Sequence, residues 1–149
     1  MIEYTVKVFE DRKQWYNKEG QLHREDGPAI EYTNSDKVWF KNGKLHRKDG
    51  PAIEEVNGDK AWYLNDKRHR EDGPAVELTN GYKAWWINNK RHREDGPAIE
   101  YASGSKSWYI NDRQVSEQEF NKKMGKSIEI DGVYYSKETL KNLIKKALS

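Results

Sequence analysis

The stretch Lys60–Glu77 reads KAWYLNDKRHREDGPAVE and contains every element of a unit that recurs along the chain. Its marker HRxDGPA is found in four copies, which begin at His23, His46, His69 and His92, so the unit is 23 residues long. A tryptophan precedes the histidine position by seven residues at Trp39, Trp62, Trp85 and Trp108. Self-similarity at a fixed period of this length indicates a repeat architecture.

The two ends of the array depart from this spacing. Trp15 lies eight residues before His23, which predicts one extra residue in the turn at 17–20. After Trp108 the histidine position holds Val115, and the HRxDGPA loop is missing. We therefore expect the array to end near residue 115.

Each unit predicts two short strands and two turns. Residues 52–56 and 60–64 carry β-favouring side chains, and Asn57-Gly58 between them is a strong hairpin signal. Residues 65–66 mark the next turn, and Asp-Gly-Pro should form a sharp corner in which the glycine takes a positive φ. The predicted fold is mainly β, an elongated antiparallel meander of tandem 23-residue β-hairpin repeats with a small α-containing C-terminal cap.

Both faces of this sheet should carry apolar groups. Along one strand Trp62 and Leu64 share a face, while Ala61 and Tyr63 share the other. A single-layer sheet would expose one of these faces. We expect the HRxDGPA loops or the C-terminal helix to cover one side.

The chain divides into residues 1–14, an N-terminal capping strand, residues 15–115, the repeat array, and residues 116–149, a C-terminal cap. Ser116 and Glu119 have the spacing of a capping box that begins a helix, a hairpin is expected at 128–135, and Ser136 begins a second helix. We expect the apolar face of that helix to cover the sheet, so that Leu143→Asp lowers the melting temperature; the face consists of Leu140, Leu143, Ile144, Ala147 and Leu148.

Composition excludes several classes of protein. Hydrophobic residues make up 34% and charged residues 35%, but 12% are aromatic, which indicates a thin aromatic-rich core rather than disorder. The net charge of +2 predicts no general attraction to nucleic acid or anionic membranes. Without cysteine there is no disulfide, thiolate zinc site or Cys nucleophile. No signal peptide or membrane-spanning stretch is recognisable, so a cytoplasmic protein is expected.

The recurring His-Arg-x-Asp sequence is open to a catalytic and a structural interpretation. Since each unit adds two strands about 4.8 Å apart, equivalent histidines should lie on the order of 10 Å apart, whereas zinc ligands lie about 2 Å from one ion. We therefore predict a loop brace, with no catalytic residue, metal or cofactor. The tryptophan row resembles a base-stacking platform, but one recurring strand position with balanced charge favours core packing, and nucleic-acid binding is not expected.

Function should lie where the copies differ or where donors remain free. Arg70 and Arg93 can bind phosphates if their donors are not used within the loop. Tyr82 and Trp86 are unusual in the fourth copy, and the lysines of the last helix lie opposite its leucines. The candidate binding residues are Tyr82, Trp86, Arg70, Arg93, Lys141 and Lys145.

The motif Trp-Tyr-x-Asn-Gly-Lys-x-His-Arg is similar to the MORN family of β-hairpin repeats, and units with HREDGPA resemble those of bacteriophage and giant-virus accessory proteins. The resemblance covers residues 15–115 and implies a hairpin sheet and a viral source, but no site residues. The expected function is a non-enzymatic anti-defence protein that inhibits a host factor by stoichiometric binding, either blocking a host protein or sequestering a nucleotide signal. The alternatives are a metal-assisted nuclease or phosphodiesterase and a MORN-type scaffold for protein or lipid. The oligomeric state is left open.

Overall fold

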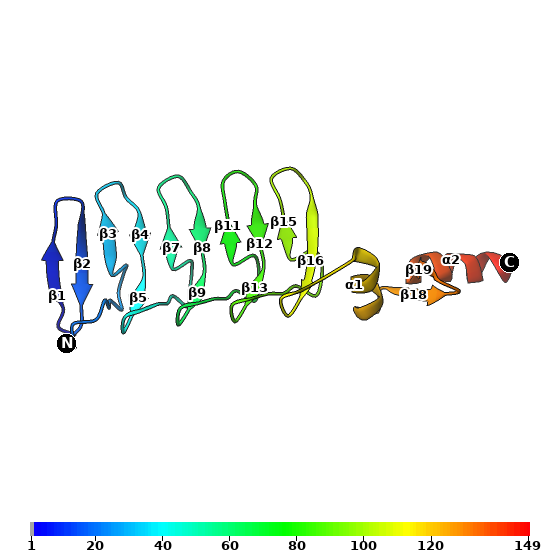
Figure 1. Ribbon diagram of the computed structural model, residues 1–149, viewed down its shortest axis with the longest axis horizontal. Coiled ribbons are helices and arrows are strands. Elements are labelled where there is room, and N and C mark those ends of the chain that lie inside the picture. Colours follow the sequence, from blue (N-terminus) through cyan, green and yellow to red (C-terminus); the bar gives the residue numbers. More distant parts are fainter. Residues whose placement is uncertain (1) are drawn as a thin grey trace.

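A computed structural model describes residues 2–149 and shows a mainly β protein built around one long antiparallel sheet (Figure 1). The sheet has 11 strands, and their order in space follows their order in the chain, so the sheet is a meander as predicted. Its strands are β1 Thr5–Val8, β2 Arg12–Tyr16, β3 Ile30–Tyr32, β4 Lys37–Val38, β7 Ile53–Glu54, β8 Lys60–Ala61, β11 Val76–Glu77, β12 Lys83–Ala84, β15 Ile99–Glu100, β16 Lys106–Ile110 and β17 Arg113–Val115.

A small two-stranded hairpin lies beyond the end of the second strand in three of the units, below the main sheet in Figure 1. The expected strand 60–64 is divided, because Lys60–Ala61 pairs within the main sheet while Tyr63–Leu64 pairs with the strand that follows. The three hairpins are β5 Phe40–Lys41 with β6 Lys44–Leu45, β9 Tyr63–Leu64 with β10 Lys67–Arg68, and β13 Trp86–Ile87 with β14 Lys90–Arg91. Their turns have positive φ at both central residues, as at Asn42 (49°) and Gly43 (75°), which suits a two-residue hairpin.

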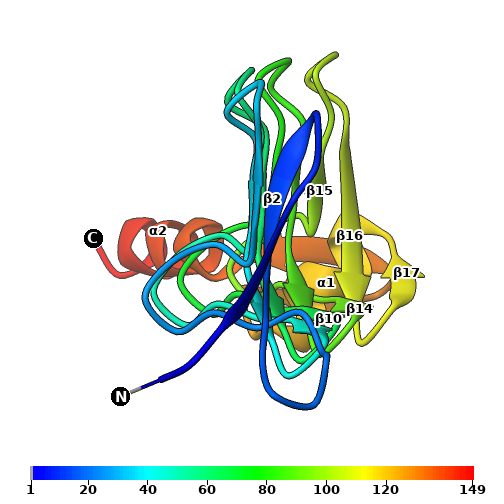
Figure 2. The same cartoon turned by 90° about the vertical axis from the view of Figure 1, so that its left-hand side faces the viewer.

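The two faces of the sheet have different cores. On the face that carries the HRxDGPA loops, which we call the loop face, an alanine lies between successive tryptophans: Trp39 and Trp62 donate their backbone N–H to Ala52 and Ala75. The alanines Ala29, Ala52, Ala75 and Ala98 are fully buried. On the opposite face, the register aligns Ile53, Ala61, Val76 and Ala84 in one apolar row. In Figure 2 the loops bulge to one side of the strands, which confirms that the loops cover one face.

Carboxylates at the hairpin tips join neighbouring units. Asp36 accepts a hydrogen bond from the N–H of Val56 at 2.7 Å, and Asp59 accepts one from Thr79 at 2.7 Å. The donated hydrogen bond from Thr79 lowers the pKa of Asp59. At these two tips the carboxylate therefore fixes the backbone of the next unit.

The C-terminal part begins with α1, Glu117–Lys123, and continues with β18 Ser127–Ile130, β19 Val133–Ser136 and α2 Lys137–Ala147. Ser116 caps α1 by accepting from the N–H of Glu119, but the Glu119 carboxylate bonds Arg113, so only half of the expected capping box forms. Phe120 on α1 is 1% exposed and seals the end of the array.

The expectation that the last helix covers the sheet is wrong. Helix α2 lies beyond the end of the array and contacts β19 (Figure 1). Leu143 and Leu148 are 53% and 84% exposed, and no residue of α2 is buried. The physical reason is that the loops already cover the loop face, so the amphipathic pattern of α2 finds only its own small hairpin. No helix in residues 2–149 is long and apolar enough to cross a membrane.

The C-terminal part is itself a tandem repeat. Residues 110–120 read INDRQVSEQEF and residues 130–140 read IDGVYYSKETL, and both form a strand, a turn, a second strand and a serine-capped helix. Phe120 and Leu140 occupy the same place, four residues after the capping serine. The second copy repeats the design of the first without a sheet to pack against.

Candidate functional site

The centre of each HRxDGPA loop is an arginine stacked on the tryptophan of its own unit. In the second loop the guanidinium of Arg47 lies 3.9 Å from the centre of the Trp39 ring. The same side chain donates to Asp49, to the carbonyl oxygen of Pro51 at 3.1 Å and to Glu54 at 2.7 Å. The same set of contacts is present at Arg24, Arg70 and Arg93. The predicted loop brace is therefore built mainly by arginine.

The glycine of Asp-Gly-Pro is needed for space and not for a positive φ, which corrects the sequence-based expectation. The residues with positive φ within 2–149 do not include Gly27, Gly50, Gly73 or Gly96. A Cβ at Gly73 would lie 2.8 Å from the guanidinium carbon of Arg70, and the other three positions are similarly close to their arginines. Any side chain there would displace the arginine from its tryptophan.

The histidines connect each loop to the following unit. The ring Nδ1 of His23 accepts a hydrogen bond from the N–H of Asn42 at 2.9 Å, which lies in the next small turn. His46, His69 and His92 accept in the same way from Asn65, Asn88 and Asn111. An accepting Nδ1 leaves Nε2 to carry the proton of the neutral ring. Residues 2–149 contain no cluster of three or more His, Asp or Glu side chains suited to a metal.

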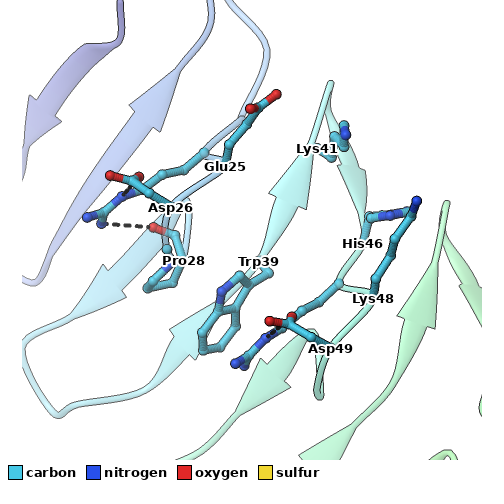
Figure 3. Close-up of a pocket in the computed structure, with 11 residues that line it drawn as sticks. Glu25, Asp26, Pro28, Trp39, Lys41, His46, Lys48 and Asp49 are labelled. Carbon is cyan, nitrogen blue, oxygen red and sulfur yellow. Dashed lines mark hydrogen bonds and ion pairs between the residues drawn. The ribbon is translucent and has the colours of Figure 1, made fainter. Parts of the chain in front are cut away.

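Three equivalent grooves open between successive loops on the loop face. Groove 1 lies between the loop at 24–28 and the loop at 46–49, with a volume of about 700 Å³ (Figure 3). Groove 2 lies between the loops at 48–51 and 69–72, and groove 3 between those at 70–74 and 92–95, with volumes of about 750 and 810 Å³. One wall of each groove is Asp-Gly-Pro and the other is the tryptophan of the next unit.

The grooves differ at two positions. The residue two after the tryptophan is Lys41 in groove 1, Leu64 in groove 2 and Ile87 in groove 3. The residue after the loop arginine is Lys48 in the second loop, but a glutamate in the other three. Groove 1 is lined by four basic side chains (Arg24, Lys41, Arg47 and Lys48) and three carboxylates (Glu25, Asp26 and Asp49), whereas groove 3 is lined by two arginines and four carboxylates (Glu71, Asp72, Glu94 and Asp95). Charge changes from basic to acidic along the row.

Arginine holds the loop aspartates in the charged form. The hydrogen bond from Arg70, followed by its charge, lowers the pKa of Asp72. The hydrogen bond from Arg93 lowers the pKa of Asp95 in the same way. These carboxylates are anions at neutral pH, and both side chains line groove 3.

Tyr4 lies beside the first loop, in the position that a groove occupies beside each later loop. The ring of Tyr4 lies 6.3 Å from the ring of His23, and its hydroxyl accepts the N–H of Glu25 at 3.0 Å. In the later loops the same N–H belongs to Lys48, Glu71 and Glu94, and no group within residues 2–149 accepts from these three. Sequence reasoning missed Tyr4 because its partner lies in a loop some 20 residues away; its position just before the first strand is the only signal.

The candidate binding residues proposed from the sequence fall into three separate places. Arg70 and Arg93 line groove 3 together, each with its Nε and one terminal nitrogen already bonded inside its loop. Lys141 and Lys145 are exposed on α2, away from the grooves. Tyr82 and Trp86 pack on the opposite face against a buried cluster that includes Ala84, Ile99 and Tyr109.

Tyr82 and Trp86 have structural partners that explain why this unit differs. Tyr82 stands where earlier units have Asp36 and Asp59, and its ring packs edge-on against Tyr101 at 5.9 Å, in place of the carboxylate link. Burial raises the pKa of Tyr82. Trp86 lies between the guanidinium groups of Arg68 and Arg91, at 5.2 and 5.8 Å.

Similarity to known proteins does not indicate a function for this chain. No protein-family model, no curated protein and no solved structure matches the chain. The chain is an array of β-hairpin repeats with a row of grooves on its loop face.

Proposed function

We propose that the protein is a non-enzymatic binding protein that holds an extended segment of a protein partner across grooves 1 to 3. The observation that carries this proposal is the repetition of the groove itself. Each copy presents a tryptophan wall, an Asp-Gly-Pro wall and a backbone N–H that no group within residues 2–149 accepts. Equivalent sites in a row suit a ligand that is also repetitive or extended.

The spacing of the grooves matches a polypeptide. Two strands of the sheet separate one groove from the next, so neighbouring grooves lie about 9.6 Å apart. Three residues of polyproline II span about 9.3 Å, and three residues of an extended strand about 9.9 Å. In polyproline II, which has three residues per turn, every third side chain would therefore meet a groove, whereas side chains three residues apart in an extended strand point to opposite faces.

Tyr4 indicates which side chains the grooves suit. At the first loop an aromatic ring lies beside the histidine while its hydroxyl accepts the loop N–H. Grooves 2 and 3 add Leu64 and Ile87, which favours an aromatic or apolar side chain there. The lysines of groove 1 and the carboxylates of groove 3 would orient the segment, with its acidic end at groove 1 and its basic end at groove 3.

The contacts inside the loops favour binding over the other functions considered. Each loop arginine spends its Nε and one terminal nitrogen on its own loop, which leaves few donors for a nucleotide phosphate. Each histidine uses Nδ1 to hold the next unit. A metal-assisted nuclease would need one loop to differ from its copies, and these contacts recur in all four.

The finer role follows from the same mode of action. The resemblance to MORN-type repeats of viral accessory proteins suggests a host protein as partner. A partner segment held across three grooves would be occupied one to one, so an enzyme whose active-site segment bound there would lose activity at one equivalent. We therefore retain stoichiometric inhibition of a host defence factor as the proposed biological role.

The test uses fluorescein-labelled peptides and substitutions borrowed from other units. The probe has tyrosine at every third position, Tyr-Ser-Gly repeated four times, and the comparison peptide has tyrosine at every fourth position. Leu64→Lys with Ile87→Lys copies the residue found at Lys41, so the fold should tolerate it. We expect this double variant to weaken binding of the first probe about tenfold in fluorescence anisotropy, and the comparison peptide to bind about tenfold more weakly than the probe.

Two control variants place the binding surface. Trp86→Tyr copies Tyr63 on the opposite face, and Lys141→Glu with Lys145→Glu changes the charge of α2. Both should leave probe binding within about twofold of the unmodified chain. Equal binding of the two peptides, or loss of binding in a control variant rather than in the groove variant, would contradict the proposal.

A further inference from the structure

The two end strands of the long sheet differ in how far the rest of the chain covers them. At the β17 end the chain continues into α1, and Val115 and Phe120 are 6% and 1% exposed. At the β1 end all four strand residues are exposed, and Val6 and Val8 are 46% and 71% exposed. An uncovered edge strand presents a row of backbone donors and acceptors that another strand can pair with. The strand β1, which the sequence predicts to cap the array, is therefore an uncovered edge strand.

The hydrogen-bond pattern of β1 shows which residues face outward. Phe9 donates its N–H to the carbonyl of Arg12, and Lys7 and Thr5 follow it at two-residue steps in the register with β2. Backbone groups of an antiparallel strand alternate between its two neighbours. Tyr4, Val6 and Val8 therefore direct their backbone N–H and C=O away from β2, toward open solvent.

The side chains of this edge also alternate. Val6 lies opposite Trp15 in the register, so the even-numbered residues are on the loop face. Lys7 lies on the other face, where its ammonium group is 4.7 Å from the centre of the Tyr16 ring. The edge has apolar side chains on one face and charged side chains on the other.

Three symmetric antiparallel registers centred within β1 that bring outward backbone groups opposite each other are compared. They are centred on Thr5, Val6 or Lys7. The register centred on Lys7 sets two lysines opposite each other, which is unfavourable, and the register centred on Val6 leaves Lys7 opposite Thr5. The register centred on Thr5 sets Lys7 opposite Glu3 twice.

We propose that β1 is the dimerisation edge of the protein and that a second copy of the chain pairs with it in the register centred on Thr5. Two Glu3–Lys7 ion pairs form on one face of the joint. On the loop face, Val8 meets Ile2 and Val6 meets Tyr4, which covers the exposed side chains of Ile2, Val6 and Val8. The twofold axis is perpendicular to the sheet, so both loop faces point the same way.

The test is a charge exchange measured by sedimentation equilibrium on the full chain. The unmodified protein should have twice the mass of the 17.6 kDa chain at micromolar concentration. Lys7→Glu and Glu3→Lys alone each place like charges opposite each other and should raise the dimer dissociation constant about tenfold or more. The double variant Glu3→Lys with Lys7→Glu restores opposite charges and should return the constant to within about threefold of the original.

A proline variant gives an independent readout. Val6→Pro removes an outward N–H, which an edge strand tolerates, so the chain should stay folded by circular dichroism but become monomeric. A monomer for the unmodified chain at about 100 μM would overturn the proposal, as would a dimer unaffected by Val6→Pro. Failure of the charge exchange to restore the dimer would overturn the register centred on Thr5. None of these outcomes depends on whether the grooves bind a peptide.

Discussion

The repeat array and the C-terminal part both consist of strand–turn–strand units, but their units are held in different ways. In the array, two kinds of bond cross every boundary: a histidine bonds the next turn, and the N–H of the loop arginine bonds a carbonyl of the next unit, as from Arg47 to Tyr63. Tip carboxylates add a third bond at the boundaries that follow Asp36 and Asp59. In the C-terminal part, the bonds between β17–α1 and the last unit are few, chiefly Lys122 to Glu129 and Lys137 to Lys126. The array should therefore unfold as one body and the last unit separately.

The sharpest difference should appear between a residue of α1 that packs on the array and an apolar residue of α2 that does not. Phe120→Ala empties a position that is 1% exposed and should cost about 3–5 kcal/mol of unfolding free energy. Leu143→Asp, on a helix face that is 53% exposed, should change that free energy by no more than about 0.5 kcal/mol. Urea unfolding followed by tryptophan fluorescence measures both. Comparable losses would mean that α2 packs on the array after all.

A second contrast compares two arginines that each form an ion pair with a carboxylate. Arg70→Ala removes the stack on Trp62 and three hydrogen bonds and should cost about 2–3 kcal/mol. Arg113→Ala removes an exposed ion pair with Glu119 in the C-terminal part and should cost about 0–1 kcal/mol. The same denaturation experiment applies, and similar values for the two variants would show that the stack contributes nothing.

Single histidine substitutions test whether the four loops contribute about equally to the stability of the array. Replacing His46, His69 or His92 singly by alanine leaves one turn N–H without its acceptor and should cost about 1 kcal/mol each. His23 should cost somewhat more because Tyr4 also packs on it. One histidine whose loss abolishes an activity without lowering stability would instead favour the metal-assisted nuclease.

Acid should act on the array through its loop aspartates, and this is the smallest effect expected. The pKa of Asp72 and of Asp95 is lower in the folded chain than in the unfolded one, so their contribution is complete above about pH 4 and is lost as the pH falls through the folded value. Asp72→Asn with Asp95→Asn should make the melting temperature less dependent on pH below 4. An unchanged slope in thermal melts between about pH 2.5 and 5 would contradict this role.

Periodic features were predictable from the sequence, and features that depend on contacts between units were not. Tryptophan and histidine spacing predicted the hairpin array, the two-residue turns and the loop brace correctly. The purpose of Gly73 could not be seen, because the guanidinium that excludes a side chain there adopts its position only after stacking on Trp62. The apolar stripe of α2 predicted burial, but a stripe does not specify whether a surface is free to receive it.

For the candidate site, the sequence predicted that function lies where the copies differ, but it did not show which of those positions line a groove. Lys41, Leu64 and Ile87 differ between units, and all three face a groove. Tyr82 and Trp86 were singled out because they break the pattern, and the structure gives them packing partners on the opposite face. Variation between copies therefore occurs both at groove rims and at sites of local repacking, and the two differ in which face of the sheet the residue occupies.

Successive loops are separated by a constant distance, so the grooves recur at regular intervals along the array. Because the histidine bond and the arginine backbone bond recur at every boundary, inserting or deleting one whole 23-residue unit would leave these bonds intact at the remaining boundaries. The row of grooves would lengthen or shorten by about 9.6 Å, the width of two strands. Gene duplication within such an array would therefore change the length of the proposed peptide ligand in single steps of about three residues, and the added unit would use the packing already present between units.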